Sequence, residues 1–105
     1  MSAQTTDFAA QLGRAWAHHR QGNNGNAITE FEGILASSKD NVDALYGLGL
    51  ALRASGKSAQ ALEKFRLSLQ GLENMRQQNA PEDRLAMLDR MIKQRISELE
   101  GTPAR

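Results

Sequence analysis

The sequence contains no cysteine, no apolar stretch long enough to cross a membrane, and no basic segment followed by an apolar run near its first residue. The missing cysteines exclude disulfide bonds, thiolate zinc sites and cysteine nucleophiles. The other two absences predict neither a transmembrane helix nor a signal peptide. We therefore expect a chain that does not insert into membranes and that is located in the cytoplasm.

An excess of charge of one sign is also missing. The 105 residues carry 13 Lys and Arg against 12 Asp and Glu, and the two signs are interleaved along the chain. Nucleic acids and anionic membranes are usually bound by a strongly basic surface, so neither is expected as a partner. A chain of this length forms at most one domain and buries about two-thirds of its unfolded surface.

Helical periodicity is present in five segments, and no segment alternates with period two for long enough to form a strand. The first helix is expected to start at Phe8, after a cap at one of residues 5–7. The caps expected for the second, third and fourth helices are Asn24, Asp40 and Ser58, and Pro81 is expected to open the fifth helix. The apolar faces comprise Phe8, Leu12, Ala15 and Trp16; Ala27, Ile28, Phe31, Ile34 and Leu35; Val42, Leu45, Leu48, Gly49 and Leu52; Ala61, Leu62, Phe65, Leu69 and Leu72; and Leu85, Leu88, Ile92, Ile96 and Leu99.

Two helix pairs repeat each other at a constant offset. GNNGNAITEF at residues 22–31 and GKSAQALEKF at residues 56–65 both place Gly first, Ala sixth and Phe tenth. The second segment follows the first by 34 residues. A helix-turn-helix unit that repeats at this offset resembles the tetratricopeptide repeat, whose period is about 34 residues. The resemblance implies an all-α fold, a short right-handed α-α superhelix of five helices.

The resemblance also implies one domain over residues 8–101, with flexible tails at 1–7 and 102–105. Within this domain, the first repeat covers residues 8–41, the second covers 42–75, and a capping helix covers 81–100. A cap is expected because the last repeat of a solenoid leaves an open apolar edge. Large apolar positions of the family are occupied by Gln11, Arg14 and His18 in the first helix, which leaves the rotation of that helix open.

No catalytic, metal or cofactor site is expected, and the chain is predicted not to be an enzyme. The two histidines, His18 and His19, are adjacent, so on a helix they point about 100° apart and cannot bind one metal ion. Carboxylates are spread over solvated faces, often beside a base. The segment GNNGN is not followed by the Lys-Ser or Lys-Thr of a phosphate-binding loop and is better explained as a turn.

A partner-binding groove along one side of each repeat's first helix is implied by the family resemblance. Carried over by position, its residues are Leu12, Trp16, His19 and Arg20 from the first repeat and Asp43, Tyr46, Leu50 and Arg53 from the second. Aromatic and Arg side chains are the types enriched at binding hot spots. Trp16 has a core position as its alternative, because it belongs to the apolar face of its helix. The carboxylate clamp of chaperone-binding family members is disfavoured, because Leu12, Trp16 and Tyr46 occupy its positions.

Two functions from different classes remain open. The preferred one is a non-catalytic adaptor, scaffold or assembly factor that binds a peptide segment or helix of another protein in the groove. The alternative is a structural subunit fixed permanently in a larger complex or in a homo-oligomer. The apolar spacing of the fifth helix would serve the seam of a homodimer as well as an intramolecular cap.

Overall fold

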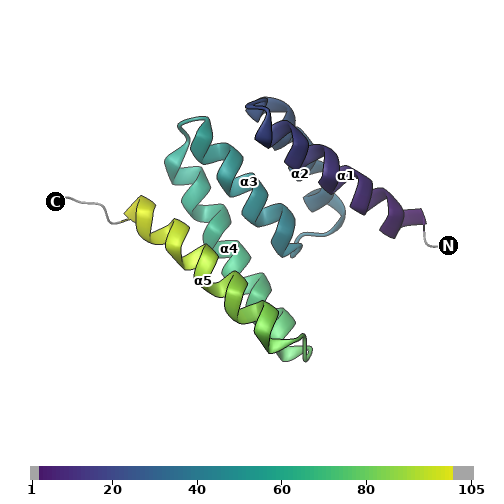
Figure 1. The fold of residues 1–105 in the computed structure, drawn as a ribbon, viewed down its shortest axis with the longest axis vertical. Helices are drawn as coiled ribbons and strands as arrows, with labels where there is room; N and C mark the ends of the chain where they lie inside the picture. The colour runs from purple at the N-terminus through teal and green to yellow at the C-terminus, as the bar shows by residue number, and fades with distance from the viewer. Residues whose placement is uncertain (1–2, 101–105) are drawn as a thin grey trace.

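The computed structural model of the protein describes residues 3–100, with side chains from residue 8 onward. It contains five helices, α1 (Ala3–Arg20), α2 (Asn24–Ser37), α3 (Val42–Ala54), α4 (Ser58–Gln77) and α5 (Glu82–Glu100). α1 packs on α2, α3 packs on α4, α2 joins the two pairs by packing on α3, and α5 lies along α4 (Figure 1). The all-α class and the helical-repeat solenoid are therefore confirmed for the described part of the chain.

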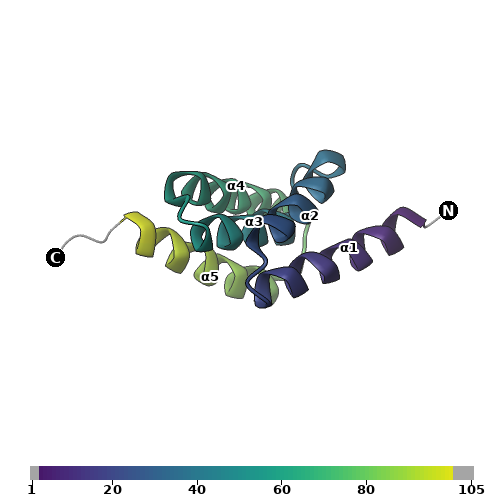
Figure 2. The same ribbon diagram turned by 90° about the horizontal axis from the view of Figure 1, so that it is seen from above.

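The arrangement leaves α1, α3 and α5 as neighbours on one side of the stack. In Figure 2, α2 and α4 lie along the upper side of the view, α1 and α5 lie along the lower side, and α3 lies between them. The two helices of each pair pack against each other because a short turn joins them and both carry apolar faces. The helices α1, α3 and α5 all contribute side chains to one pocket.

The start of α1 corrects one expectation. The helix begins at Ala3, so residues 3–7, expected as part of a flexible tail, belong to α1. No Gly or Pro interrupts this stretch, and the helix extends through residues that had been expected to cap it. The remaining parts of the expected tails, residues 1–2 and 102–105, lie outside the described residues.

The N-terminal caps also differ by one residue from their predicted positions. They are Asn23, Asn41 and Lys57, in place of Asn24, Asp40 and Ser58. Asn41 has an extended backbone, and its side-chain oxygen accepts a hydrogen bond of 3.0 Å from the backbone N–H of Ala44. Of these three residues, only Asn41 makes such a side-chain cap, so a cap of the predicted type exists at α3 but is supplied by the neighbour of Asp40.

The turns inside the two repeats are the same structure. Gly22 and Gly56, which are equivalent in the two repeats, both have a φ of 81°. The residue after each glycine donates its N–H to a carbonyl five residues back, Asn23 to His18 and Lys57 to Leu52. This is the Schellman ending of a helix, in which the positive φ favours glycine. The sequence repeat therefore corresponds to a repeated backbone conformation.

The core follows the predicted apolar faces closely. Phe31 and Phe65, the repeated aromatic residues, are fully buried. A side chain at Gly47 would overlap the ring of Phe31, and a Cβ at Gly49 would lie 2.5 Å from Cε1 of Phe65. The glycines of α3 therefore provide the space in which both rings pack. The other fully or nearly fully buried apolar side chains are Ala15, Ala27, Ile34, Val42, Ala44, Leu45, Leu48, Ala51, Leu52, Ala61, Leu72, Leu85 and Ile92.

The helix α5 caps the stack, but it is out of register with the repeats. The helix α4 has 20 residues, six more than the 14 of α2, although the two helices start at equivalent positions of their repeats, Asn24 and Ser58. As a result α5 begins at Glu82, six residues beyond Arg76, the repeat equivalent of Val42. Leu85 and Ile92 of α5 are fully buried, and Leu88, Ile96 and Leu99 pack against the same core. The apolar face of α5 is thus used within the chain.

Candidate partner-binding groove

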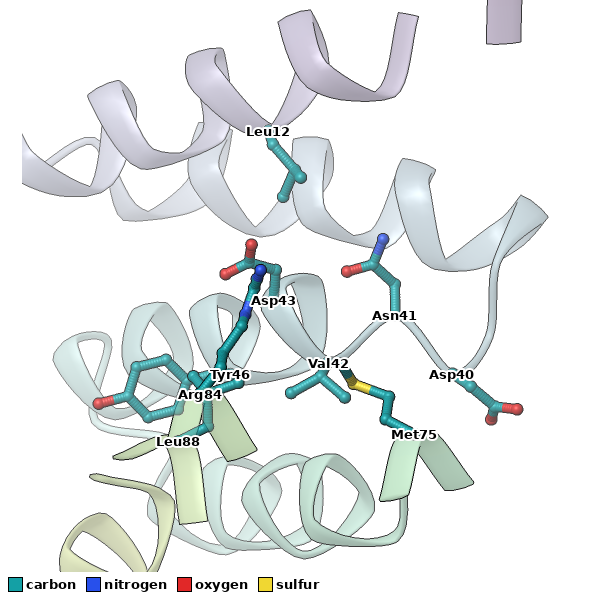
Figure 3. A pocket seen from close by; sticks show the side chains of 9 residues that line it. All are labelled: Leu12, Asp40, Asn41, Val42, Asp43, Tyr46, Met75, Arg84 and Leu88. Atoms are coloured by element: carbon teal, nitrogen blue, oxygen red, sulfur yellow. The ribbon is translucent and has the colours of Figure 1, made fainter. Parts of the chain in front are cut away.

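An open pocket lies where α1, α3 and α5 meet (Figure 3). Its volume is about 320 Å³, and we call it the central pocket. Leu12 points from α1 toward α3, and Arg84 of α5 points toward Asp43 of α3 (Figure 3). The lining consists of Leu12, Asp40, Asn41, Val42, Asp43, Tyr46, Met75, Arg84 and Leu88. Apolar side chains from four helices thus form a pocket with charged residues around it.

A second pocket adjoins the central pocket at Tyr46. Its volume is about 310 Å³, and its lining consists of Tyr46, Arg90, Met91, Gln94 and Arg95. We call it the arginine pocket. Tyr46 lines both pockets, so they adjoin at its side chain, and we call the two pockets together the groove between α3 and α5.

Tyr46 is held by aromatic neighbours on both sides. Its ring centroid lies 5.7 Å from that of Phe65 and 6.5 Å from that of Trp16. Burial raises the pKa of the Tyr46 hydroxyl, while the nearby Arg95 and Arg53 lower it and Glu98 raises it further. Because the net shift is upward from 10.0, the hydroxyl is protonated at neutral pH and can donate a hydrogen bond.

Trp16 connects the core with this groove. Its ring meets that of the buried Phe31 edge-on at 5.2 Å, and it also meets His19 at 5.9 Å. The side chain is half-buried, with Tyr46 on its other flank. Both alternatives for Trp16 therefore have a structural counterpart, since one part of the ring packs on the core and another lies beside a groove residue.

Arg53 is engaged within the chain. Its Nη1 donates to Oε1 of Glu98 at 2.5 Å, which joins α3 to α5, and Glu98 also pairs with Arg95 at 2.9 Å. The hydrogen bond from Arg53, and next that from Gln94, hold the pKa of Glu98 below its ordinary value. Arg53, which the family resemblance predicts as a groove residue, is therefore already paired with a carboxylate of α5.

The eight predicted groove residues are therefore only partly brought together. Leu12, Asp43 and Tyr46 line the central pocket, and Trp16 adjoins them. Leu50 is half-buried against the core and His19 is half-buried beside Trp16. Arg20 is exposed at the last residue of α1 and lines neither pocket.

Sequence reasoning missed the contribution of α5. The additional lining residues from this helix are Arg84, Leu88, Arg90, Met91, Gln94 and Arg95. A signal was present in the two methionines of α5 that lie off its buried stripe, Met87 and Met91, which are 54% and 38% exposed. Exposed methionines one turn apart are typical of adaptable binding surfaces.

The described residues form neither a metal-binding cluster nor a membrane-spanning helix. Among them, no group of three His, Cys, Asp or Glu side chains is placed to hold a metal ion. Within residues 3–100, none of the helices combines the length and the apolar character needed to cross a lipid bilayer.

Comparison with known families agrees with the helix pairs and their repeated turns. A family model described as tetratricopeptide repeat matches residues 12–83, which is more than half of the chain. The chain belongs to the tetratricopeptide repeat family. Domains of this family generally mediate protein–protein interaction and are typically non-catalytic. Searches of curated proteins and of solved structures gave no match to the chain.

Proposed function

We propose that this tetratricopeptide repeat domain is a non-catalytic adaptor that binds a segment of a partner protein in the groove formed by α1, α3 and α5. The observation that carries the proposal is that two neighbouring pockets, the central pocket and the arginine pocket, share Tyr46 in their lining. The groove has an apolar floor and a charged rim, which is the composition of a site that buries side chains and fixes their register.

Tyr46 is the residue expected to contribute most to binding. Its ring is fixed by Phe65 and Trp16, so little conformational entropy is lost when a partner covers it. Its protonated hydroxyl adds a hydrogen-bond donor at the rim. Replacement by Ala would remove the wall that the two pockets share, and we expect an affinity loss of about 2 kcal/mol, which is the usual scale of an aromatic hot spot.

A structural subunit remains the second candidate, favoured by the exposed apolar side chains Leu67, Met87 and Met91. A homodimer through the apolar stripe of α5 has less support, because Leu85 and Ile92 of that stripe are fully buried within the chain. A permanent subunit would expose enough apolar surface to aggregate or dimerise when purified alone. Light scattering on the purified protein separates the candidates, since an adaptor is expected to be a monomer.

The adaptor proposal is tested by capture of partners with the tagged protein and two matched variants. Tyr46→Ala is expected to abolish capture, whereas Leu67→Ala removes an exposed apolar side chain from α4 outside both pockets and is expected to retain it. Met91→Lys serves as a second groove variant, because Met91 is exposed and its replacement should leave the fold intact. Thermal unfolding of each variant verifies that the fold is kept.

Capture that survives both groove variants would contradict the proposal. Loss of capture in Leu67→Ala together with survival in Tyr46→Ala would move the binding site to the outer face of α4. A stable dimer that captures nothing would favour the structural subunit.

A further inference from the structure

The two pockets of the groove differ in charge. The central pocket has two carboxylates, Asp40 and Asp43, against one guanidinium, Arg84. The arginine pocket has two guanidinium groups, Arg90 and Arg95, and no carboxylate in its lining. One end of the groove is therefore acidic on balance and the other is basic.

The positive charge at the basic end is not cancelled by its surroundings. Glu98 is the single carboxylate paired with both Arg53 and Arg95, so this group of three retains one positive charge. Arg90 forms no ion pair with any residue between 8 and 100. The arginine pocket therefore presents an excess of two positive charges beside the Tyr46 hydroxyl and the Gln94 amide.

We propose that the partner segment carries an acidic side chain that binds in the arginine pocket, next to a large apolar side chain that enters the central pocket. This inference rests on the proposed function and adds the chemistry of the bound segment. Arg90 and Arg95 offer N–H donors suited to a carboxylate, and Tyr46 and Gln94 can add further hydrogen bonds. The carboxylates of Asp40 and Asp43 repel an acid at the other end, which fixes the order of the two side chains.

The spacing of the two side chains follows from α5. Leu88 lines the central pocket, and Met91 and Arg95 line the arginine pocket, three and seven residues further along the same helix. At a rise of 1.5 Å per residue, the two subsites lie roughly 5–10 Å apart along α5. This spacing fits residues i and i+3 or i+4 of a bound helix, or i and i+2 of an extended segment.

The acid is expected to be an internal side chain of the segment. The residues of α5 that line the arginine pocket lie between Arg90 and Arg95, and α5 runs on to Glu100 beyond them. The family match ends at residue 83, just after the start of α5. The arginine pocket is thus built largely by a helix that the family match leaves out.

The test begins with a displayed library of random dodecapeptides, selected on the wild-type protein and counter-screened on Tyr46→Ala. Clones that require Tyr46 are expected to share an Asp or Glu two to four positions from a large apolar residue. The most enriched sequence is then synthesised with a C-terminal amide, and its affinity for the protein is measured by fluorescence anisotropy. The amide removes the terminal carboxylate, so the bound acid must be a side chain.

Arg90→Glu is compared with Lys57→Glu, which makes the same change of net charge in the exposed turn before α4. An exposed ion pair contributes up to about a fivefold change in affinity, and charge reversal adds repulsion. We therefore expect Arg90→Glu to weaken the acidic peptide about fivefold or more relative to Lys57→Glu. The same variant should bind a peptide with Lys in place of the acid better than the wild type does.

Two outcomes would overturn the inference in distinguishable ways. Clones that require Tyr46 but lack the acid, or equal affinities for Arg90→Glu and Lys57→Glu, would refute the acidic subsite and leave the groove as a binding site. If no clone depended on Tyr46, the inference and the proposed adaptor function would both fail.

Discussion

Replacement of Gly49 by Ala tests the packing on which the second repeat depends. The new Cβ would lie 2.5 Å from Cε1 and 2.7 Å from Cδ1 of Phe65, a ring that is fully buried. Overpacking of this kind costs about 1–3 kcal/mol, and a site this tight belongs at the upper end. Ala is better than Gly in a helix interior by about 1 kcal/mol. The expected net loss of stability is therefore about 2 kcal/mol.

The first repeat shows how the protein accommodates a methyl group at the equivalent position. Residue 15 is Ala, and the ring of Phe31 packs over Gly47 of the following helix pair. The ring of Phe65 has no glycine of the following helix to pack over, because α5 contains none. On the groove side, the ring centroid of Tyr46 lies 5.7 Å from that of Phe65. Gly49→Ala should therefore lower the free energy of unfolding, although the first repeat has Ala at the equivalent position.

The assay is thermal or urea unfolding of Gly49→Ala beside Gly13→Ala. Gly13 is exposed on α1 and a Cβ there would contact nothing, so that variant should gain about 1 kcal/mol. For a domain of this size, the loss at Gly49 corresponds to a Tm lower by roughly 8 °C or more. The double variant Gly49→Ala with Phe65→Leu should lose less stability than the sum of the two single changes. A Gly49→Ala protein as stable as Gly13→Ala would refute the packing argument.

Three further predictions concern caps, turns and the α3–α5 ion pair. Asn41→Ala should lower the unfolding free energy by about 1 kcal/mol in urea titrations, because α3 loses its side-chain cap. Gly56→Ala should cost about 1–2 kcal/mol by the same assay although no atom obstructs its Cβ, since the cost comes from φ at 81°. Glu98→Gln should lower Tm at pH 7, because Arg53 holds the pKa of Glu98 below 4.5. Since a depressed pKa stabilises the fold only while the carboxylate is ionised, the Tm difference should be complete above pH 4.5 and vanish as the pH falls through the lowered pKa.

The helices and their buried faces could be predicted because each apolar face repeats with the helical period over three or more turns. Phe31 and Phe65 are buried as expected, and the glycine turns repeat at the expected offset. Individual caps could not be fixed in the same way. Asp40 and Asn41 are both good capping types, and the choice between them depends on which residue adopts the extended backbone.

The residues that line the candidate groove follow the repeat where it is regular and depart from it in α5. One repeat period connects Leu12 with Tyr46, and the structure places both in the central pocket. A second period counted from Tyr46 leads to Ala80, which lies between helices, whereas Leu88 occupies the pocket. The additional length of α4 causes this mismatch, because it delays the start of α5.

The longer α4 also explains why the groove has its present chemistry. Six additional residues lengthen a helix by roughly 9 Å, and this extension carries Met75 to the floor of the central pocket. It also lets α5 return along α4 with its arginines facing Tyr46. A third repeat in strict register would have placed a different set of side chains there. The lining of the proposed groove therefore depends on the helix that breaks the repeat, and we expect variants among the pocket residues of α5 to change peptide selection more than variants in α1.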